Sequence, residues 1–183
     1  LGDVYKRQRT LGVVGNSSTL TINVNGTNDA PVIRAKDVQV NSYTDDKQYY
    51  SSVTALTDGG YVISWVEFQF AAESQVFGMR YDATGAIVGD QFQVSTGISG
   101  NELLPRYTNS AGLADGGFVV TWSSSSQDGS GRDVYGQRFD GLGAAAGSEF
   151  QINSYTDSDQ YLSSLAALAD GGFIVIWNSY EQD

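Results

Sequence analysis

The sequence predicts an all-β fold, in which antiparallel four-stranded repeats form part of a β-propeller, preceded by the last strand of a β-sandwich domain. The first supporting observation is a motif, Asp-Gly-Gly-aromatic followed by an apolar run and Trp, at residues 58–65, 115–122 and 170–177. The Trp residues lie 57 and 55 residues apart, and a fixed period of this kind indicates a repeat architecture. The second is that each repeat contains short runs rich in β-branched and aromatic residues, separated by Gly-containing turns. Four strands per repeat of about 55 residues is typical of a propeller blade.

The first nine residues are not expected to belong to the natural protein. Residues 2–8 resemble the in-frame translation of a transposon-end adaptor used in sequencing libraries, and residue 1 is Leu. Residues 1–9 are therefore expected to be an artefact that takes no part in the fold, and the chain is expected to be a fragment of a much longer protein.

The next segment differs from the repeats. Residues 18–25 alternate between polar and apolar side chains, which is the pattern of a half-buried strand. We assign residues 10–33 to the end of a sandwich domain and residues 34–38 to a linker.

The repeat region covers residues 39–183 and divides into copies at 39–92, 93–150 and 151–183, the third of which stops before its last two strands. In the first copy the predicted strands are 52–56, 61–68, 76–81 and 91–94. Asp-Gly-Gly between the first two strands is a strong hairpin signal, because Gly adopts positive φ without a Cβ clash.

Both faces of the second strand of each repeat are largely apolar. Tyr61, Ile63 and Trp65 point to one face, and the residues between them point to the other. A half-exposed sheet would alternate between apolar and polar residues, so this pattern predicts sheets stacked on both sides. The rival interpretation is a string of β-sandwich domains, for which about 55 residues per domain is short.

The composition excludes several kinds of chemistry. The chain has no Cys and no His, which excludes disulfides, His-based triads and zinc sites with these ligands in this stretch. The net charge is −11, with −12 in residues 49–183, which argues against nucleic acid and anionic membranes as partners. No apolar run is long enough for a membrane span. The acidity is compatible with calcium, and equally with a surface that is charged for solubility.

The string Thr-Asn-Asp-Ala-Pro-Val at residues 27–32 resembles the C-terminal end of VCBS repeats, which are cadherin-like modules of very large bacterial surface proteins. In cadherins, a related Asp-x-Asn-Asp linker binds calcium between domains. By this resemblance Asn28 and Asp29 are calcium ligands, although Gly26 stands where the first Asp would be. The alternative is a simple turn before the next domain.

Residues 39–183 resemble repeats of large, calcium-associated bacterial proteins that are exported by type I secretion and often carry glycine-rich RTX repeats. The similarity rests on the Asp-Gly-Gly motif, on Gln-Asp-Gly-Ser-Gly at 127–131 and on Val-Tyr-Gly-Gln-Arg-Phe-Asp at 134–140. It implies a secreted or cell-surface protein that acts in adhesion. The expected partners are a cell-surface protein or glycan and the neighbouring repeats of the same chain.

Four further acidic residues are candidate calcium ligands in the repeat loops. Asp128 and Asp133 flank a Gly-rich turn, and Asp157 and Asp159 lie in the loop that opens the third repeat. The alternatives are a hairpin loop for the first pair and a solvated turn for the second.

The residues common to the repeats are interpreted as architectural. The Asp of each Asp-Gly-Gly motif is expected to cap the hairpin backbone. The three Trp residues are expected to pack between blades, with a sugar-stacking platform as the alternative. Arg80 and Arg138 are expected to form structural pairs. The sequence therefore predicts a non-catalytic interaction or scaffold module; the alternative is a fragment of a propeller lectin or carbohydrate-active enzyme whose site lies elsewhere.

Overall fold

The computed structural model describes residues 10–14, 17–21, 38–41, 47–68, 74–96, 105–125 and 131–180. The chain divides into two compact units, residues 1–45 and 46–183. All regular elements in the described ranges are β-strands, and all strand pairs are antiparallel. The prediction of an all-β, antiparallel fold is therefore confirmed.

The first unit contains one sheet of three strands in the order β1-β2-β3. Its strands are β1 (Thr10–Val14), β2 (Ser17–Thr21) and β3 (Val38–Gln39). β1 and β2 form a hairpin in which Val14 pairs with Ser17, and Leu20 of β2 pairs with Val38 of β3.

The second unit contains three sheets, each formed by strands that follow one another in the chain. The first sheet comprises β4 (Lys47–Ala55), β5 (Tyr61–Phe68), β6 (Gln75–Tyr81) and β7 (Ile87–Gln93). The second comprises β8 (Arg106–Gly112), β9 (Phe118–Ser125), β10 (Arg132–Phe139) and β11 (Phe150–Gln151). The third comprises β12 (Gln160–Ala167) and β13 (Phe173–Ser179).

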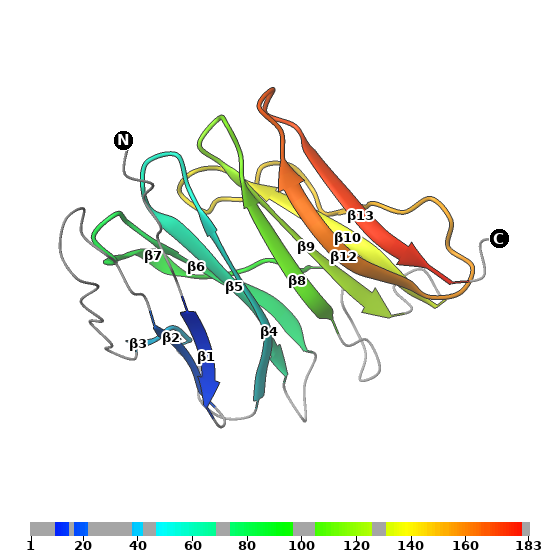
Figure 1. The fold of residues 1–183 in the computed structure, drawn as a ribbon, viewed down its shortest axis with the longest axis horizontal. Coiled ribbons are helices and arrows are strands. Elements are labelled where there is room, and N and C mark those ends of the chain that lie inside the picture. Colours follow the sequence, from blue (N-terminus) through cyan, green and yellow to red (C-terminus); the bar gives the residue numbers. More distant parts are fainter. Residues whose placement is uncertain are drawn as a thin grey trace, which may run out of the picture. The chain divides into compact units, whose positions relative to one another are not determined.

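The first strands of the three sheets are neighbours in space. β8 lies against β4 on one side and against β12 on the other, as Figure 1 shows. The sheets of the second unit thus succeed one another along a row of first strands, and the later strands of each sheet lead away from that row.

The Asp-Gly-Gly turns have the same geometry in all three sheets. Asp58 Oδ1 accepts a hydrogen bond of 2.9 Å from the backbone N–H of Gly60, and the equivalent bonds in the other two turns are 3.0 and 2.9 Å. The first Gly of the motif has φ between 86° and 89° in each copy, which a side chain would disfavour. The predicted capping role of the Asp is therefore confirmed.

The same Asp side chains form ion pairs with the third strand of their sheet. Arg80 of β6 donates to Asp58, and Arg138 of β10 donates to Asp115 at 2.9 Å. The predicted structural pairing of both arginines is confirmed. Each pair ties the turn between the first two strands to the strand that follows them.

The core lies between the sheets and not within a single one. Phe118 and Trp122 of β9 pack in one cluster with Val62 and Val66 of β5. Val119, on the opposite face of β9, belongs to a second cluster against which Leu165 and Phe173 of the third sheet pack. The central sheet is therefore covered by apolar side chains on both faces, as the sequence pattern predicts.

Two of the three Trp residues lie in the core, as predicted. Trp65 and Trp122 are almost completely buried, whereas Trp177 of β13 is 36% exposed. A buried Trp side chain offers no platform for a sugar, so the alternative role fails for Trp65 and Trp122.

We predict that Trp122→Ala destabilises the chain strongly, by about 3–5 kcal/mol, because it removes a large side chain from between two sheets. Trp177→Ala is the matched control, since Trp177 occupies the same position of the motif but is partly exposed. Urea unfolding of both variants measures the difference. Equal losses of unfolding free energy would contradict the packing described above.

Candidate functional site

Each first strand carries a β-bulge at the same point of the repeat. In the β4–β5 pair, Tyr49 pairs with Val66 and Ser52 with Ser64, so that two residues of β4 lie opposite Trp65. The β8–β9 pair shifts its register in the same way opposite Trp122, and the β12–β13 pair shifts next to Trp177. Bulges of this kind change the direction in which a side chain points, so they determine which side chains of the first strands reach the surface.

The bulges hold two tyrosines in an unfavourable backbone conformation. Tyr50 has φ of 53° and Tyr107, 57 residues later, has φ of 55°. This left-handed region costs about 1–2 kcal/mol for a residue with a Cβ atom. The hydroxyl of Thr108 donates to the backbone oxygen of Tyr50, which joins the bulge of β8 to that of β4. Strained backbone of this kind is frequent at ligand-binding sites.

The bulges place three tyrosine side chains at the surface. Tyr49, Tyr50 and Tyr107, which we call the tyrosine cluster, are 43%, 40% and 39% exposed. The ring centroids of Tyr49 and Tyr50 lie 6.0 Å apart, and those of Tyr50 and Tyr107 lie 5.0 Å apart, with tilted planes. The cluster thus combines two adjacent sheets into one aromatic surface.

The strands beneath the cluster are held closely together. The hydroxyls of Ser52 and Ser110 lie 3.0 Å apart, and the backbone N–H of Gly112 donates to the Thr54 hydroxyl at 3.0 Å. A Cβ atom on Gly112 would lie only 2.2 Å from the backbone oxygen of Ala55, so this approach requires Gly. The strands that carry the tyrosine cluster, β4 and β8, are therefore held in a fixed relative position.

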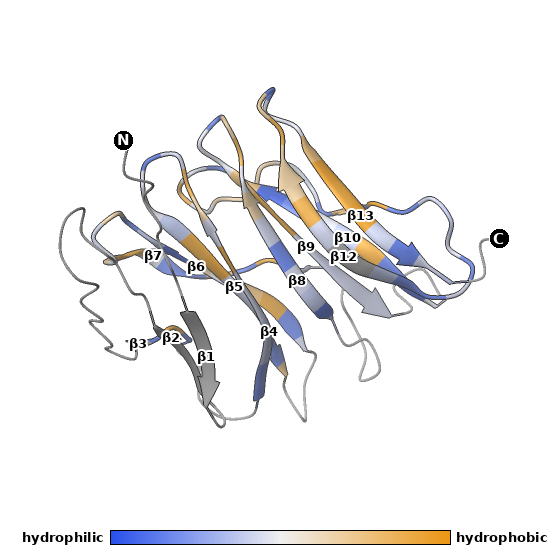
Figure 2. Ribbon diagram, in the orientation of Figure 1, coloured by the Kyte–Doolittle hydropathy of each residue, from blue (hydrophilic) through white to orange (hydrophobic). Residues whose placement is uncertain are grey.

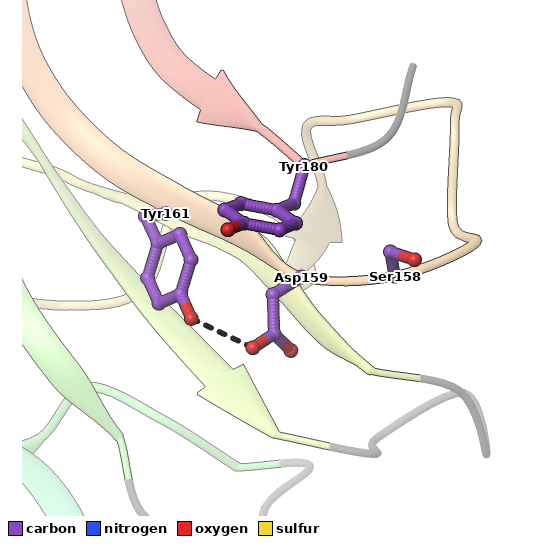
Figure 3. A pocket seen from close by; sticks show the side chains of 4 residues that line it. All are labelled: Ser158, Asp159, Tyr161 and Tyr180. Carbon is purple, nitrogen blue, oxygen red and sulfur yellow. Dashed lines mark hydrogen bonds between the residues drawn. The ribbon is translucent and has the colours of Figure 1, made fainter.

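A pocket of about 230 Å³ lies at the start of β12, lined by Ser158, Asp159, Tyr161 and Tyr180. We call it the β12 pocket. Tyr161 occupies the same position of the repeat as Tyr49, next to the bulge. Its hydroxyl donates to Asp159 Oδ2 at 2.7 Å, and Figure 3 shows the two side chains meeting beside the ring of Tyr180. The hydrogen bond to this carboxylate raises the pKa of Tyr161. The pocket thus offers two aromatic rings, a carboxylate and three hydroxyls.

The candidate calcium ligands Asn28, Asp29 and Asp128 lie outside the described residues. Asp133 is described, and its side chain is completely buried. Asp133 Oδ1 accepts a hydrogen bond of 2.5 Å from Asn153 Nδ2, and Asn153 Oδ1 accepts the backbone N–H of Val134. This arrangement links the loop after β11 to the start of β10.

The first sheet builds the same link without a charge. Ser95 takes the place of Asn153: its hydroxyl accepts the backbone N–H of Val76 at 2.9 Å and donates to Gln75 at 2.8 Å. Gln75 therefore occupies the position of Asp133. In the first sheet, a neutral amide therefore makes the hydrogen bond that the Asp133 carboxylate makes in the second sheet.

Asp157 and Asp159 form hydrogen bonds through different groups. The backbone oxygen of Asp157 accepts a hydrogen bond from the Gln160 side chain, while the carboxylate of Asp159 accepts from Tyr161. Among the described residues, no group of three or more acidic side chains is placed to hold a metal ion. Calcium binding by the loops stays a prediction.

No sequence pattern predicts the tyrosine cluster. The bulges have no sequence signal of their own, since an extra residue in a strand is visible only through its pairing. A weak signal did exist, because the spacing of Tyr50 and Tyr107 equals that of the first two Trp residues. Exposed residues that share a repeat position are candidates for function as much as buried ones.

Comparison of the chain with protein-family models, with curated proteins and with solved structures finds no match.

We predict that Asp58 makes the stability of the chain sensitive to acid. The hydrogen bond from the backbone N–H of Gly60, together with the charge of Arg80, lowers the pKa of Asp58 below its ordinary value of 3.8. A group whose pKa is lower in the folded state stabilises the fold above its unfolded pKa, and this contribution is lost as the pH falls through the folded pKa.

Asp58→Asn retains an acceptor for Gly60 but does not titrate. Between about pH 5 and pH 2, the free energy of unfolding should therefore fall less steeply for this variant than for the unaltered chain. Urea unfolding at a series of pH values measures both slopes, and identical slopes would contradict the role of the Asp58 charge.

Proposed function

We propose that this chain is a non-catalytic interaction module of a large extracellular bacterial protein that acts in adhesion. In this proposal the three sheets of the second unit are consecutive blades of a β-propeller, and the tyrosine cluster contacts the ligand. The support comes from the repeat architecture, from the surface that the bulges create and from the resemblance of the repeats to those of secreted bacterial proteins.

The arrangement of the strands supports the propeller interpretation. Each complete sheet runs in sequence order from its first strand to its fourth, and the first strands β4, β8 and β12 are neighbours. Propeller blades are four-stranded sheets arranged in this way around an axis. The faces that meet between sheets are apolar, as they are between blades.

Localisation outside the cell rests on the resemblance of the repeats and of residues 27–32 to secreted proteins. In the described ranges, the structure contains no helix with the length and apolar character of a membrane span. The strong negative charge of residues 49–183 favours a neutral or cationic ligand over nucleic acid.

The tyrosine cluster is the observation that carries the binding function. The side chains shared by all repeats form turns, ion pairs and core, while these three rings are exposed. A tyrosine offers a rigid apolar ring with a hydroxyl at its edge, which suits recognition at low entropic cost. A sugar ring matches this chemistry, because its C–H bonds can lie on the negative face of an aromatic ring while its hydroxyls exchange hydrogen bonds. We therefore propose a glycan as the ligand.

A second candidate function is that of a lectin that recognises a single sugar unit. The β12 pocket favours it, because the Asp159 carboxylate and the Tyr161 and Ser158 hydroxyls surround a small polar space. A monosaccharide that competes completely for the pocket would support this candidate, whereas a requirement for a longer glycan would support the tyrosine cluster.

We predict that Tyr50→Ala and Tyr107→Ala each weaken glycan binding by at least about five-fold, because aromatic residues at the centre of an interface carry much of its energy. A glycan array probed with the 183-residue chain identifies the ligand, and calorimetry measures the variants. Leu142→Ala is the control, since Leu142 is an isolated exposed apolar residue. Unchanged affinity of both tyrosine variants, or binding to no glycan on the array, would contradict the proposal.

Calcium stabilisation is the second part of the proposal. Asn28, Asp29, Asp128, Asp157 and Asp159 are the proposed ligands, whereas Asp133 does not fit because its buried carboxylate is engaged with Asn153.

We predict that millimolar calcium raises the melting temperature of the chain by mass action on the folded state. Asp133→Ala should lower the melting temperature by the same amount in calcium and in chelator, because it removes one of the two acceptors of the buried Asn153 amide and leaves only the backbone oxygen of Tyr155. The absence of any calcium effect would overturn calcium stabilisation. A calcium effect that disappears in Asp133→Ala would make Asp133 a ligand.

A further inference from the structure

The outer edge and one face of the third sheet differ from their counterparts in the first two sheets. β5 pairs with β4 and β6, and β9 pairs with β8 and β10, whereas β13 pairs only with β12 in the described part of the chain. An unpaired edge presents a row of N–H and C=O groups that can accept another strand. Figure 2 shows that the first half of β13, beside this edge, is hydrophobic.

The exposed residues of β13 correspond to buried residues of the other sheets. Ile174 and Ile176 are 52% and 57% exposed. At the same repeat positions β5 has Val62 and Ser64, and β9 has Val119 and Thr121, all of which are completely buried. The surface left open on β13 thus continues a pattern of interfaces that the chain itself forms twice.

Asp170 differs from its counterparts in its ion pairing. It caps Gly172 as its counterparts cap their turns, with a bond of 2.9 Å. Its two counterparts also accept an arginine of the third strand of their sheet. Within the described residues, Asp170 has no such ion pair.

We propose that the edge of β13 binds an extended strand with the sequence pattern of β6 and β10, namely Val-aromatic-Gly-x-Arg-aromatic. The register follows from the two existing pairs. Arg80 and Arg138 lie opposite Val62 and Val119, so the arginine of the added strand lies opposite Ile174. Its aromatic residue lies opposite Trp177, as Phe77 lies opposite Trp65 and Tyr135 opposite Trp122.

The occupant is a further strand of this repeat and not a second β13. Antiparallel pairing of two β13 strands would bring the Asp170 carboxylates no arginine. The docked strand instead supplies the cation for Asp170 and backbone partners along the whole edge, which is the mode of β-strand addition. This inference does not depend on the ligand of the tyrosine cluster.

A labelled peptide with the sequence of residues 132–140 tests the proposal against the 183-residue chain. We expect saturable binding in fluorescence anisotropy, accompanied by a blue shift of Trp177 emission, since the other two Trp residues are already buried. A peptide with Pro in place of Gly136 and Gln137 should not bind, because adjacent prolines remove N–H groups on both sides of the strand.

Charge variants test the register. Asp170→Asn retains the acceptor for Gly172 and loses the charge. It should therefore lower the affinity for the peptide by about two- to five-fold, which is the effect of one exposed ion pair. The same variant should not affect a peptide in which Arg138 is replaced by Gln. Equal binding of the diproline peptide would overturn the proposal, and so would a chain that dimerises through β13 in sedimentation and takes up no peptide.

Discussion

The second unit depends on apolar contact between the faces of neighbouring sheets. The strands β5 and β9 are apolar on both sides, and a sheet of this kind cannot be stable with one face in water. The central sheet satisfies the requirement, with Phe118 and Trp122 on one face and Val119 on the other. Each of the two core clusters among the described residues joins side chains of two sheets, so the stability of each repeat depends on the next, as in repeat proteins generally.

The Asp-Gly-Gly turn makes this stacking reproducible. The Asp side chain fixes the turn through the N–H group of the second Gly and reaches the third strand through an arginine. The second Gly is required by its position, because a Cβ atom on Gly60 would lie 2.4 Å from the backbone oxygen of Tyr81. With the turn fixed, the register of the three strands is fixed, and Trp122 then packs in one cluster with Val62 and Val66 of the first sheet. The motif therefore carries architecture, and the proposed binding surface lies elsewhere.

Much of this architecture could be predicted from the sequence, because local chemistry determines it. The hairpins follow from Gly and Asp, and the strand faces follow from the alternation of side chains; β5 begins and ends at the predicted residues 61 and 68. The first strand was predicted at residues 52–56 but begins at Lys47, because its N-terminal half is polar and contains the bulge. The tyrosine cluster could not be predicted for the same reason: the positive φ of Tyr50 and Tyr107 depends on hydrogen bonds between strands that are 58 residues apart in sequence.

The first two sheets differ in charge at the position of Asp133, where the first sheet has Gln75. Asp133 looks like a ligand in the sequence because it follows a Gly-rich turn, yet Gln75 performs the same connection in the first sheet. The corresponding hydrogen bond in the first sheet is made by an amide, so this bond by itself does not require the charge of Asp133. The bulges behave differently, since Tyr50 and Tyr107 both accept an unfavourable backbone conformation and still remain at the surface. Burial cannot account for these two exposed rings, and a ligand that stacks on them would supply the missing advantage.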